Sequence, residues 1–276
     1  MHESMFERFP IQALRDVYLR TLAAGSGGFP ASKIQKGLVL GLSDQDLSEE
    51  GVGFGLPVLK LGLESIFPGS WRMSAEKYHA FSLIKADFEM NLAARMAKGN
   101  HVVNNHIFCL VKETFSKIHR EHPRFRSRMS NLSDILRKNL GLEDVFCEIP
   151  FLGSVSVAYT IIGSRIDVEL KIPTILGCTE LIVLNEQGAN WFNTYRDSDG
   201  LILKGNEIGS WDEIQANYAS FIDPVDGLSF TLKRVEGARM FRGRELVAGR
   251  LAWSGLAYVL PPQREEFAYS IELDRI

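Results

Sequence analysis

The sequence predicts a mainly β protein, an antiparallel β-sandwich with an inserted α-helical arm. Two observations favour this class. From residue 147 onward, short alternating apolar stretches follow one another with turn-forming residues between them, which is typical of antiparallel sandwiches rather than of βαβ units. Between residues 104 and 140 the apolar residues instead recur at helical spacing. We therefore expect a single β-sandwich domain over residues 1–276, with a helical insertion at 104–140.

The composition is that of a folded globular chain. The 276 residues are 45% hydrophobic and 24% charged, which allows a sizeable core. The net charge of −3 divides into +2 for residues 1–150 and −5 for residues 151–276. Neither part is basic enough to indicate nucleic-acid binding, so a nucleic-acid partner is not expected.

The cysteines and the N-terminus bear on location and cofactors. Cys109, Cys147 and Cys178 are far apart and match neither a disulfide framework nor a zinc-binding spacing. The first residues, MHESMFE, lack the basic start and apolar run of a signal peptide, and no apolar stretch is long enough to span a membrane. We expect a soluble, cytoplasmic protein without a metal or cofactor.

The first third of the chain is expected to contain one helix and three strands. Pro10 and the apolar residues up to Leu22 predict a short amphipathic helix, and the glycine-rich residues 25–30 predict a linker. Strands are expected at residues 37–42, 52–58 and 81–96, where the last range alternates between charged and apolar residues.

The glycines of residues 51–57 (GVGFGLP) do not form a phosphate-binding loop. A dinucleotide-binding loop needs GxGxxG between a strand and a helix, whereas the spacing here is GxGxG and Pro57 opposes a helix. Alternation instead places Gly53, Gly55 and Pro57 on one bare face of a strand. We expect another part of the chain to pack on that face, and a flat ligand is the alternative.

The expected helical arm is strongly basic. Residues 104–140 contain eight Lys or Arg against three Asp or Glu, and Arg120, Arg124, Arg126 and Arg128 surround His119 and His122. A solvated helix face is the favoured interpretation. The alternative is a docking surface for an anionic partner such as phosphate, an acidic glycan, RNA or a membrane surface. His119 and His122 have no third ligand nearby, so two surface histidines are favoured over a metal site.

The remaining chain is expected to be strands. Residues 154–162 and 165–172 alternate on either side of Gly163-Ser164, which predicts a two-residue β-hairpin. Further strands are expected at 180–184, 201–204, 218–222, 228–234, 245–253, 256–260 and 267–273.

Residues 181–227 combine aromatic side chains with carboxylates and amides, the groups that bind polyhydroxylated ligands. Two carboxylates facing one glycosidic bond could process a sugar. The catalytic candidates are Glu186, Asp197 and Glu207, and the substrate-binding candidates are Asn190, Trp191, Asn193, Tyr195, Arg196 and Trp211. The alternative is that many of the acids belong to β-turns, because residues 197–200 (DSDG) and 223–227 (DPVDG) are strong turn sequences. Residues 197–200 are also only a fragment of a calcium-binding loop.

One run in this stretch carries a family resemblance. The order of the predicted strands, the run from Leu184-Asn185 to Asn190-Trp191-Phe192-Asn193 and the alternation at 267–273 resemble the galactose-mutarotase-like supersandwich. The resemblance implies a fold shared by sugar epimerases and by domains of glycosidases and polysaccharide lyases. Mutarotases present a histidine acid in this run, and Ala189 stands about where it is expected, so mutarotase chemistry is not carried over. Glu265 or Glu266 is a nominal match for the glutamate base.

The sequence thus predicts a carbohydrate-binding or carbohydrate-modifying protein, of epimerase, glycosidase or lyase type, with an aromatic and carboxylate cleft. A lyase would use Asn190 or Asn193 to neutralise a uronate, but the net charge of −7 over residues 180–226 would repel a polyuronate. The alternative class is a non-catalytic interaction protein that docks an anionic partner through the basic arm.

Overall fold

The computed structural model describes residues 7–22, 33–42, 51–62, 64–98, 101–102, 141–209, 211–247 and 250–276. These residues form antiparallel strands, turns and the short 3-10 helix η3 (Gly205–Ile208). The prediction of a mainly β, antiparallel protein is therefore confirmed. The expected helical arm at 104–140, its basic cluster and the linker at 25–30 lie outside the described residues. No helix in the described part of the chain is long and apolar enough to cross a membrane.

Most strands belong to one 16-stranded antiparallel sheet. Its order is β13-β12-β15-β16-β19-β10-β9-β6-β5-β4-β11-β18-β17-β14, and β7 and β8 also pair with β6. In chain order the strands are β4 (Gly53–Leu61), β5 (Glu64–Lys77), β6 (Ser82–Lys98), β7 (His101–Val102), β8 (Leu142–Glu148), β9 (Ser154–Ile162), β10 (Arg165–Lys171), β11 (Cys178–Gly188), β12 (Thr194–Asp197), β13 (Ile202–Lys204), β14 (Asp212–Ile214), β15 (Tyr218–Ile222), β16 (Leu228–Lys233), β17 (Arg239–Val247), β18 (Arg250–Leu260) and β19 (Glu266–Arg275).

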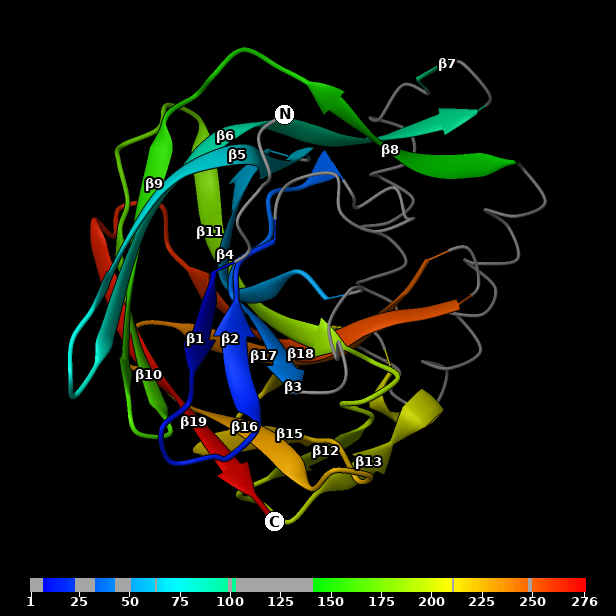
Figure 1. The fold of residues 1–276 in the computed structure, drawn as a ribbon. Helices are drawn as coiled ribbons and strands as arrows, with labels where there is room; N and C mark the ends of the chain where they lie inside the picture. The colour runs from blue at the N-terminus through cyan, green and yellow to red at the C-terminus, as the bar shows by residue number, and fades with distance from the viewer. Residues whose placement is uncertain are drawn as a thin grey trace, which may run out of the picture.

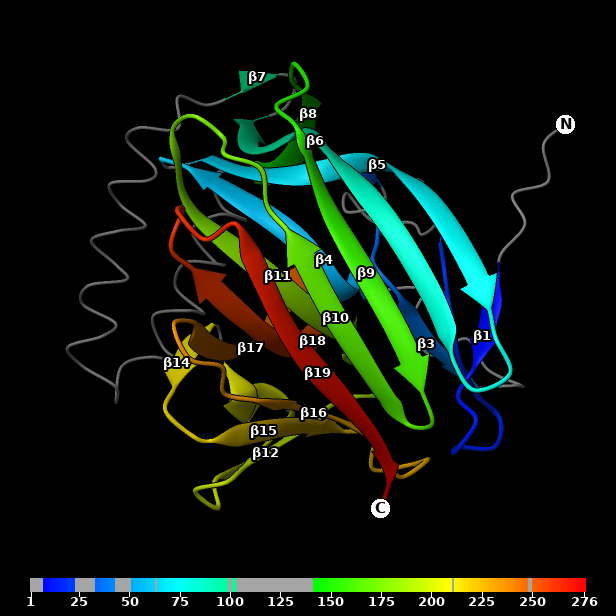
Figure 2. The same cartoon turned by 90° about the vertical axis from the view of Figure 1, so that its left-hand side faces the viewer.

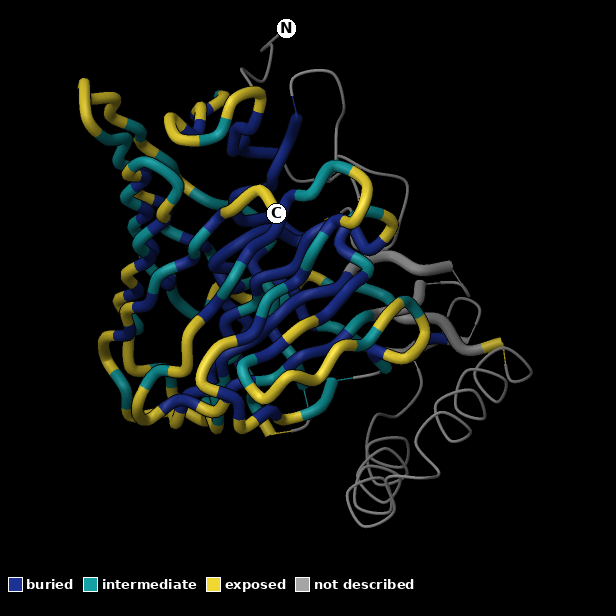
Figure 3. The backbone as a smooth tube through the Cα atoms, turned by 90° about the horizontal axis from the view of Figure 1, so that it is seen from below, coloured by how far each residue is buried: buried dark blue, intermediate teal, exposed yellow. Residues whose placement is uncertain are grey.

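This sheet folds over to make the two layers of a sandwich. Figure 2 shows β19, β10, β9, β6 and β5 in front of β4, β11, β18 and β17, and Figure 1 shows the two layers from the side. Side chains from both layers meet between them: the rings of Phe54 on β4 and Phe230 on β16 are 5.3 Å apart, and the Tyr159 hydroxyl on β9 donates to the Phe54 carbonyl at 2.9 Å. Buried backbone accordingly crosses the middle of the molecule in Figure 3.

A second, three-stranded sheet replaces the helix expected from Pro10 to Leu22. It consists of β1 (Arg8–Pro10), β2 (Val17–Arg20) and β3 (Val39–Leu42) in that order. The helix prediction was wrong because all four residues of β2 are buried, which hides the period of two that marks a strand. The strand expected at 37–42 is confirmed in β3.

Strand β4 confirms both the predicted strand at 52–58 and the close packing of its bare face. A Cβ at Gly53 would lie 2.7 Å from the backbone of Gly37, and one at Gly55 would lie 2.7 Å from the Tyr159 hydroxyl. Gly55 also has a φ of 73°, in the left-handed region that favours glycine. Because Gly53 and Gly55 have no side chains, the Gly37 backbone and the Tyr159 side chain can pack directly against β4.

The predicted hairpin at 154–172 is also confirmed. Strands β9 and β10 pair with Ile162 opposite Arg165, and Gly163 between them has a φ of 59°. The expected strand at 81–96 corresponds to β6. One break is misplaced: strands expected at 245–253 and 256–260 prove to be the end of β17 and a continuous β18 from Arg250 to Leu260.

Candidate functional site

Strand β11 carries Glu186 in a row of residues that crosses four strands. Glu186 lies opposite Gly53 of β4 on one side and Gly255 of β18 on the other, and Gly255 lies opposite Gly243 of β17. Directly paired residues of antiparallel strands present their side chains to the same face of the sheet. Glu186 and the side-chain positions of Gly255 and Gly243 therefore share one face, although Glu186 itself is only 1% exposed.

The Trp211 side chain covers the far end of this row. A Cβ at Gly243 would lie 2.7 Å from Trp211 Cδ2 and 2.9 Å from Trp211 Cα, so only glycine admits the indole here. A Cβ at Gly255 would lie 2.1 Å from the Asn185 carbonyl oxygen, so this position also needs glycine. We call Trp211, Gly243, Gly255 and Glu186 the glycine row: an indole at one end, a carboxylate at the other, and two residues without side chains between them.

Further side chains share this face. Glu213 lies opposite Phe241 in the β14–β17 pair. Phe241 is two residues from Gly243 along β17, so it is the next residue on the same face. Arg239, on the same face of β17, places its guanidinium 5.3 Å from the Phe241 ring and donates to Glu180 at 2.7 Å. The face thus combines aromatic rings, carboxylates and one arginine.

The run 189–193 forms a turn at the end of β11. The backbone amides of Trp191 and Phe192 donate to the Gly188 carbonyl at 3.1 and 3.0 Å. Phe192 is fully buried, with its ring 5.2 Å from Phe230, and Trp191 is half-buried and packs against the core. Asn190 is exposed. These contacts favour a structural role for Trp191.

Tyr195 and Asp197 form a buried pair on β12. The Tyr195 hydroxyl donates to Asp197 Oδ2 at 2.8 Å, while Asp197 Oδ1 accepts the amides of Asp199 and Leu201 at 3.0 and 3.1 Å. Burial raises the pKa of Tyr195, and the Asp197 carboxylate raises it further. The contacts of Asp197 are those of a turn-forming aspartate, and Asp223 accepts the Val225 amide at 2.9 Å in the same way.

Two arginines of β17 were not predicted as site residues, and one of them, Arg242, lies beside this pair. The Arg242 guanidinium is 5.1 Å from the Tyr195 ring, donates to the Ile208 carbonyl at 3.0 Å and lies 3.5 Å from Asp212. Arg244 donates to Asn206 at 2.6 Å, and burial lowers its pKa. Met240, Arg242 and Arg244 are alternate residues of β17, and Met240 is buried. Alternate residues of a strand share a face, so this spacing in the sequence predicts that both arginines lie on the inner face.

The predicted site residues are therefore divided between the interior of the sandwich and the outer face of β11 and β17. Arg242 lies opposite Leu256, which is opposite Asn185, so Arg242 and the Tyr195–Asp197 pair beside it face inward, whereas Glu186 and Trp211 belong to the outer glycine row. Glu207 is exposed on η3, where its Oε2 accepts the Lys204 amide at 3.1 Å, and Arg196 is also exposed. The Asn193 carbonyl accepts the Gly205 amide at 2.8 Å.

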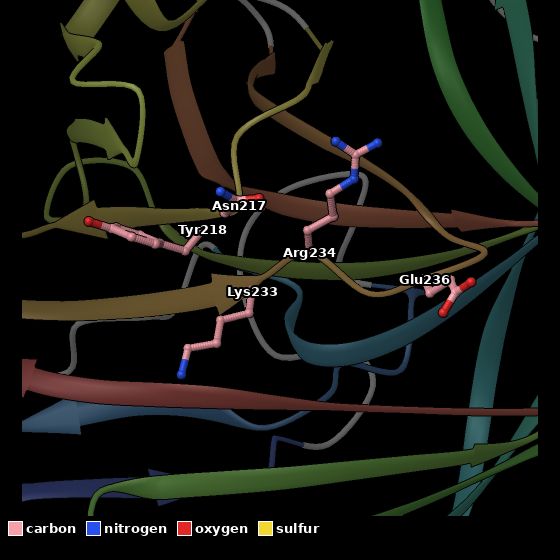
Figure 4. A pocket seen from close by; sticks show the side chains of 5 residues that line it. All are labelled: Asn217, Tyr218, Lys233, Arg234 and Glu236. Atoms are coloured by element: carbon pink, nitrogen blue, oxygen red, sulfur yellow. The ribbon is translucent and has the colours of Figure 1, made fainter.

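Two open hollows lie on the described surface. One, of about 530 Å³, is lined by Asn217, Tyr218, Lys233, Arg234 and Glu236. Figure 4 shows the Lys233 and Arg234 side chains pointing to opposite sides. Lys233 binds Glu272 at 2.6 Å and Arg234 donates to the Gln215 carbonyl at 2.8 Å, so both cations already have partners. The second hollow, of about 410 Å³, lies between Glu180, Arg239 and Pro261. Within the described ranges, no three His, Cys, Asp or Glu side chains gather as metal ligands would.

Comparison with known proteins gives similarities in structure only. No protein-family model and no curated protein sequence matches the chain. Among solved structures, it is similar to an α-N-acetylgalactosaminidase, NagBb from Bifidobacterium bifidum, with a TM-score of 0.47 and 9% identity over 97% of this chain and 35% of that chain. The Slr1438 protein from Synechocystis sp. PCC 6803 has a TM-score of 0.42 and 10% identity over 100% of this chain and 97% of that chain.

A GH36 α-galactosidase, AgaA from Geobacillus stearothermophilus, in complex with raffinose has a TM-score of 0.42 and 8% identity over 98% of this chain and 41% of that chain. This chain thus spans about a third of the NagBb chain and two fifths of the AgaA chain. All three TM-scores lie below 0.5, and all three identities are 10% or lower.

Proposed function

We propose that this protein binds a carbohydrate along the glycine row, with Trp211 as the stacking surface and Glu186 as the polar partner of the sugar hydroxyls. The observation that carries the proposal is the strand register that puts an indole and a carboxylate at the two ends of a strip without side chains. A sugar needs both groups, because its C–H face packs on an aromatic ring while its hydroxyls need directed acceptors.

The size of the strip supports a sugar as the ligand. Neighbouring strands lie about 4.8 Å apart, so Glu186 stands about 10 Å from the Gly243 backbone beneath the indole, a span of about one pyranose ring with its hydroxyls; Glu186, Gly255 and Gly243 are themselves buried. Burying a carboxylate is costly for a fold. The burial of Glu186 to 1% exposure, in spite of this cost, supports a functional role for its carboxylate.

Catalysis is the finer part of the proposal. If the protein modifies the sugar, Glu186 is the proposed acid or base, because it is the predicted catalytic residue that belongs to the row. Glu213 offers a second carboxylate on the same face. The roles predicted for Asp197 and Glu207 remain predictions, since neither residue belongs to the glycine row.

The experiment is a panel of neutral and acidic mono- and oligosaccharides titrated by calorimetry against wild type, Trp211→Ala and Glu186→Gln. Trp211→Ala should weaken binding by about tenfold or more, because the stacking surface is lost. Trp191→Phe is the matched aromatic control and should bind as wild type does. Glu207→Gln is the control for loss of an exposed carboxylate. No sugar binding by wild type, or equal binding by the folded Trp211→Ala variant, would remove the glycine row from the function.

A further inference from the structure

The two edges of strand β5 are paired over different lengths. β6 pairs with it from Ser65 to Lys77, whereas β4 pairs with the other edge only at Glu64–Ile66. The Pro68 carbonyl on this second edge accepts the Gln35 amide at 2.8 Å. Among the residues that the structure describes, no strand pairs with the second edge along residues 69–77. Figure 2 shows β5 as the outermost strand of the front layer.

An edge of this length can accept another strand. Alternate residues along it direct their amide and carbonyl groups away from β6, and a row of such groups that pairs with no described strand is a template for a further strand. Arg72, Ser74 and Glu76 are exposed on one face, and Trp71, Met73 and Ala75 are half-buried on the other. The partner must therefore match alternating charge on one face and apolar side chains on the other.

We propose that a second copy of this chain pairs with β5, antiparallel to it, about a two-fold axis at Ser74. In this register Arg72 of each copy stands opposite Glu76 of the other, so the dimer contains the same ion pair twice. Met73 stands opposite Ala75 on the apolar face. Arg72 can reach this contact because its side chain is 74% exposed. Within its own chain the Arg72 guanidinium also lies 3.5 Å from the Glu89 carboxylate. Directly opposite charges on neighbouring strands stabilise their pairing.

Charge reversal tests the register. Arg72→Glu places Glu opposite Glu76 twice, and Glu76→Arg places Arg opposite Arg72 twice, so each variant alone should dimerise about tenfold more weakly than wild type. An equimolar mixture of the two variants makes both contacts attractive and should restore the dimer. The measurement is sedimentation velocity over a range of concentrations. A variant that is merely misfolded would not be rescued by mixing.

A cysteine at the axis tests the geometry independently of charge. In the proposed pair the two Ser74 residues face each other at a Cα separation of about 4.5–5.5 Å, within disulfide range. Ser74→Cys should therefore form a covalent dimer on mild oxidation. Lys85→Cys is the matched control, because Lys85 lies opposite Ser74 but one strand further from the edge, and it should not cross-link. A monomeric wild type at every concentration, dimers unchanged by either charge reversal, or equal cross-linking at both positions would overturn the proposal.

Discussion

Tyr269 and Asn185 join the two layers of the sandwich through a buried hydrogen bond: the Tyr269 hydroxyl on β19 donates to Asn185 Oδ1 on β11 at 2.7 Å. The same oxygen accepts the Gly55 amide of β4 at 3.1 Å. One amide side chain thus serves three strands inside the core, where an unpaired polar group is costly.

Replacing Asn185 should destabilise the fold strongly. Asn185→Leu keeps the volume but leaves the Gly55 amide and the Tyr269 hydroxyl without a partner, at a cost of about 2–4 kcal/mol of unfolding free energy. Urea denaturation measures the change. Tyr269→Phe, the control, removes one donor and leaves the Gly55 bond, so it should cost about 1 kcal/mol. Equal losses for the two variants would show that Asn185 is not the shared acceptor.

Gly55→Ala should also destabilise the protein, for two physical reasons. The φ of 73° strains any side chain, and the new Cβ would lie 2.7 Å from the buried Tyr159 hydroxyl. Together these should cost about 2–4 kcal/mol. Gly163→Ala is the matched control, because Gly163 has a φ of 59° but nothing lies within 4 Å of its Cβ position. It should cost about 1 kcal/mol, and a loss as large as that of Gly55→Ala would contradict the steric argument.

Stability should fall in alkali. Burial raises the pKa values of Tyr159, Tyr195, Tyr258 and Tyr269 in the folded state. Above the ordinary tyrosine pKa of about 10, the unfolded chain releases protons that the folded chain retains, so the unfolding free energy decreases as the pH rises. Each tyrosine contributes at most about 1.4 kcal/mol per pH unit to this slope. Denaturation between pH about 8 and about 11 measures it, and Tyr159→Phe should make the slope shallower by one tyrosine's share.

The strands that could be predicted from the sequence are those with one buried and one solvated face. In β9 the buried and partly exposed residues alternate from Ser154 to Tyr159, and this period of two is visible in the sequence. Strand β2 lacks it because both of its faces are covered. Strand β5 does alternate, with Trp71, Met73 and Ala75 on one face, but no strand was predicted there.

A break expected near residues 254–255 failed for a different reason. Gly255 resembles a turn residue in the sequence, yet it lies inside β18, where its lack of a side chain admits the Asn185 carbonyl of the neighbouring strand. Close approach and turn formation both require glycine, and the sequence alone does not separate them.

The candidate site could be predicted only in part. The residue types in 181–227 indicated a sugar ligand, but their grouping depends on which residues of distant strands lie opposite one another. Glu186 shares a face with Trp211 only because β11, β18 and β17 pair in the observed register. A shift by one residue would move Glu186 to the other face. Arg242 and Arg244 escaped notice because arginines in β17 indicate no burial by themselves.

Asp197 allows a structural role to be separated from a catalytic one. Asp197→Asn keeps an Oδ1 acceptor for the amides of Asp199 and Leu201 and can pair with the Tyr195 hydroxyl through its new NH₂ group, so it should change stability by less than about 1 kcal/mol. Asp197→Ala removes all three hydrogen bonds and should cost about 2–4 kcal/mol. If Asp197 only forms the turn, the Asp197→Asn variant should bind or process the sugar found by calorimetry as well as wild type does. The control Asp199→Asn, at an exposed carboxylate, should give the same binding and turnover. Loss of turnover in Asp197→Asn, with an unchanged thermal midpoint, would instead assign the carboxylate to catalysis.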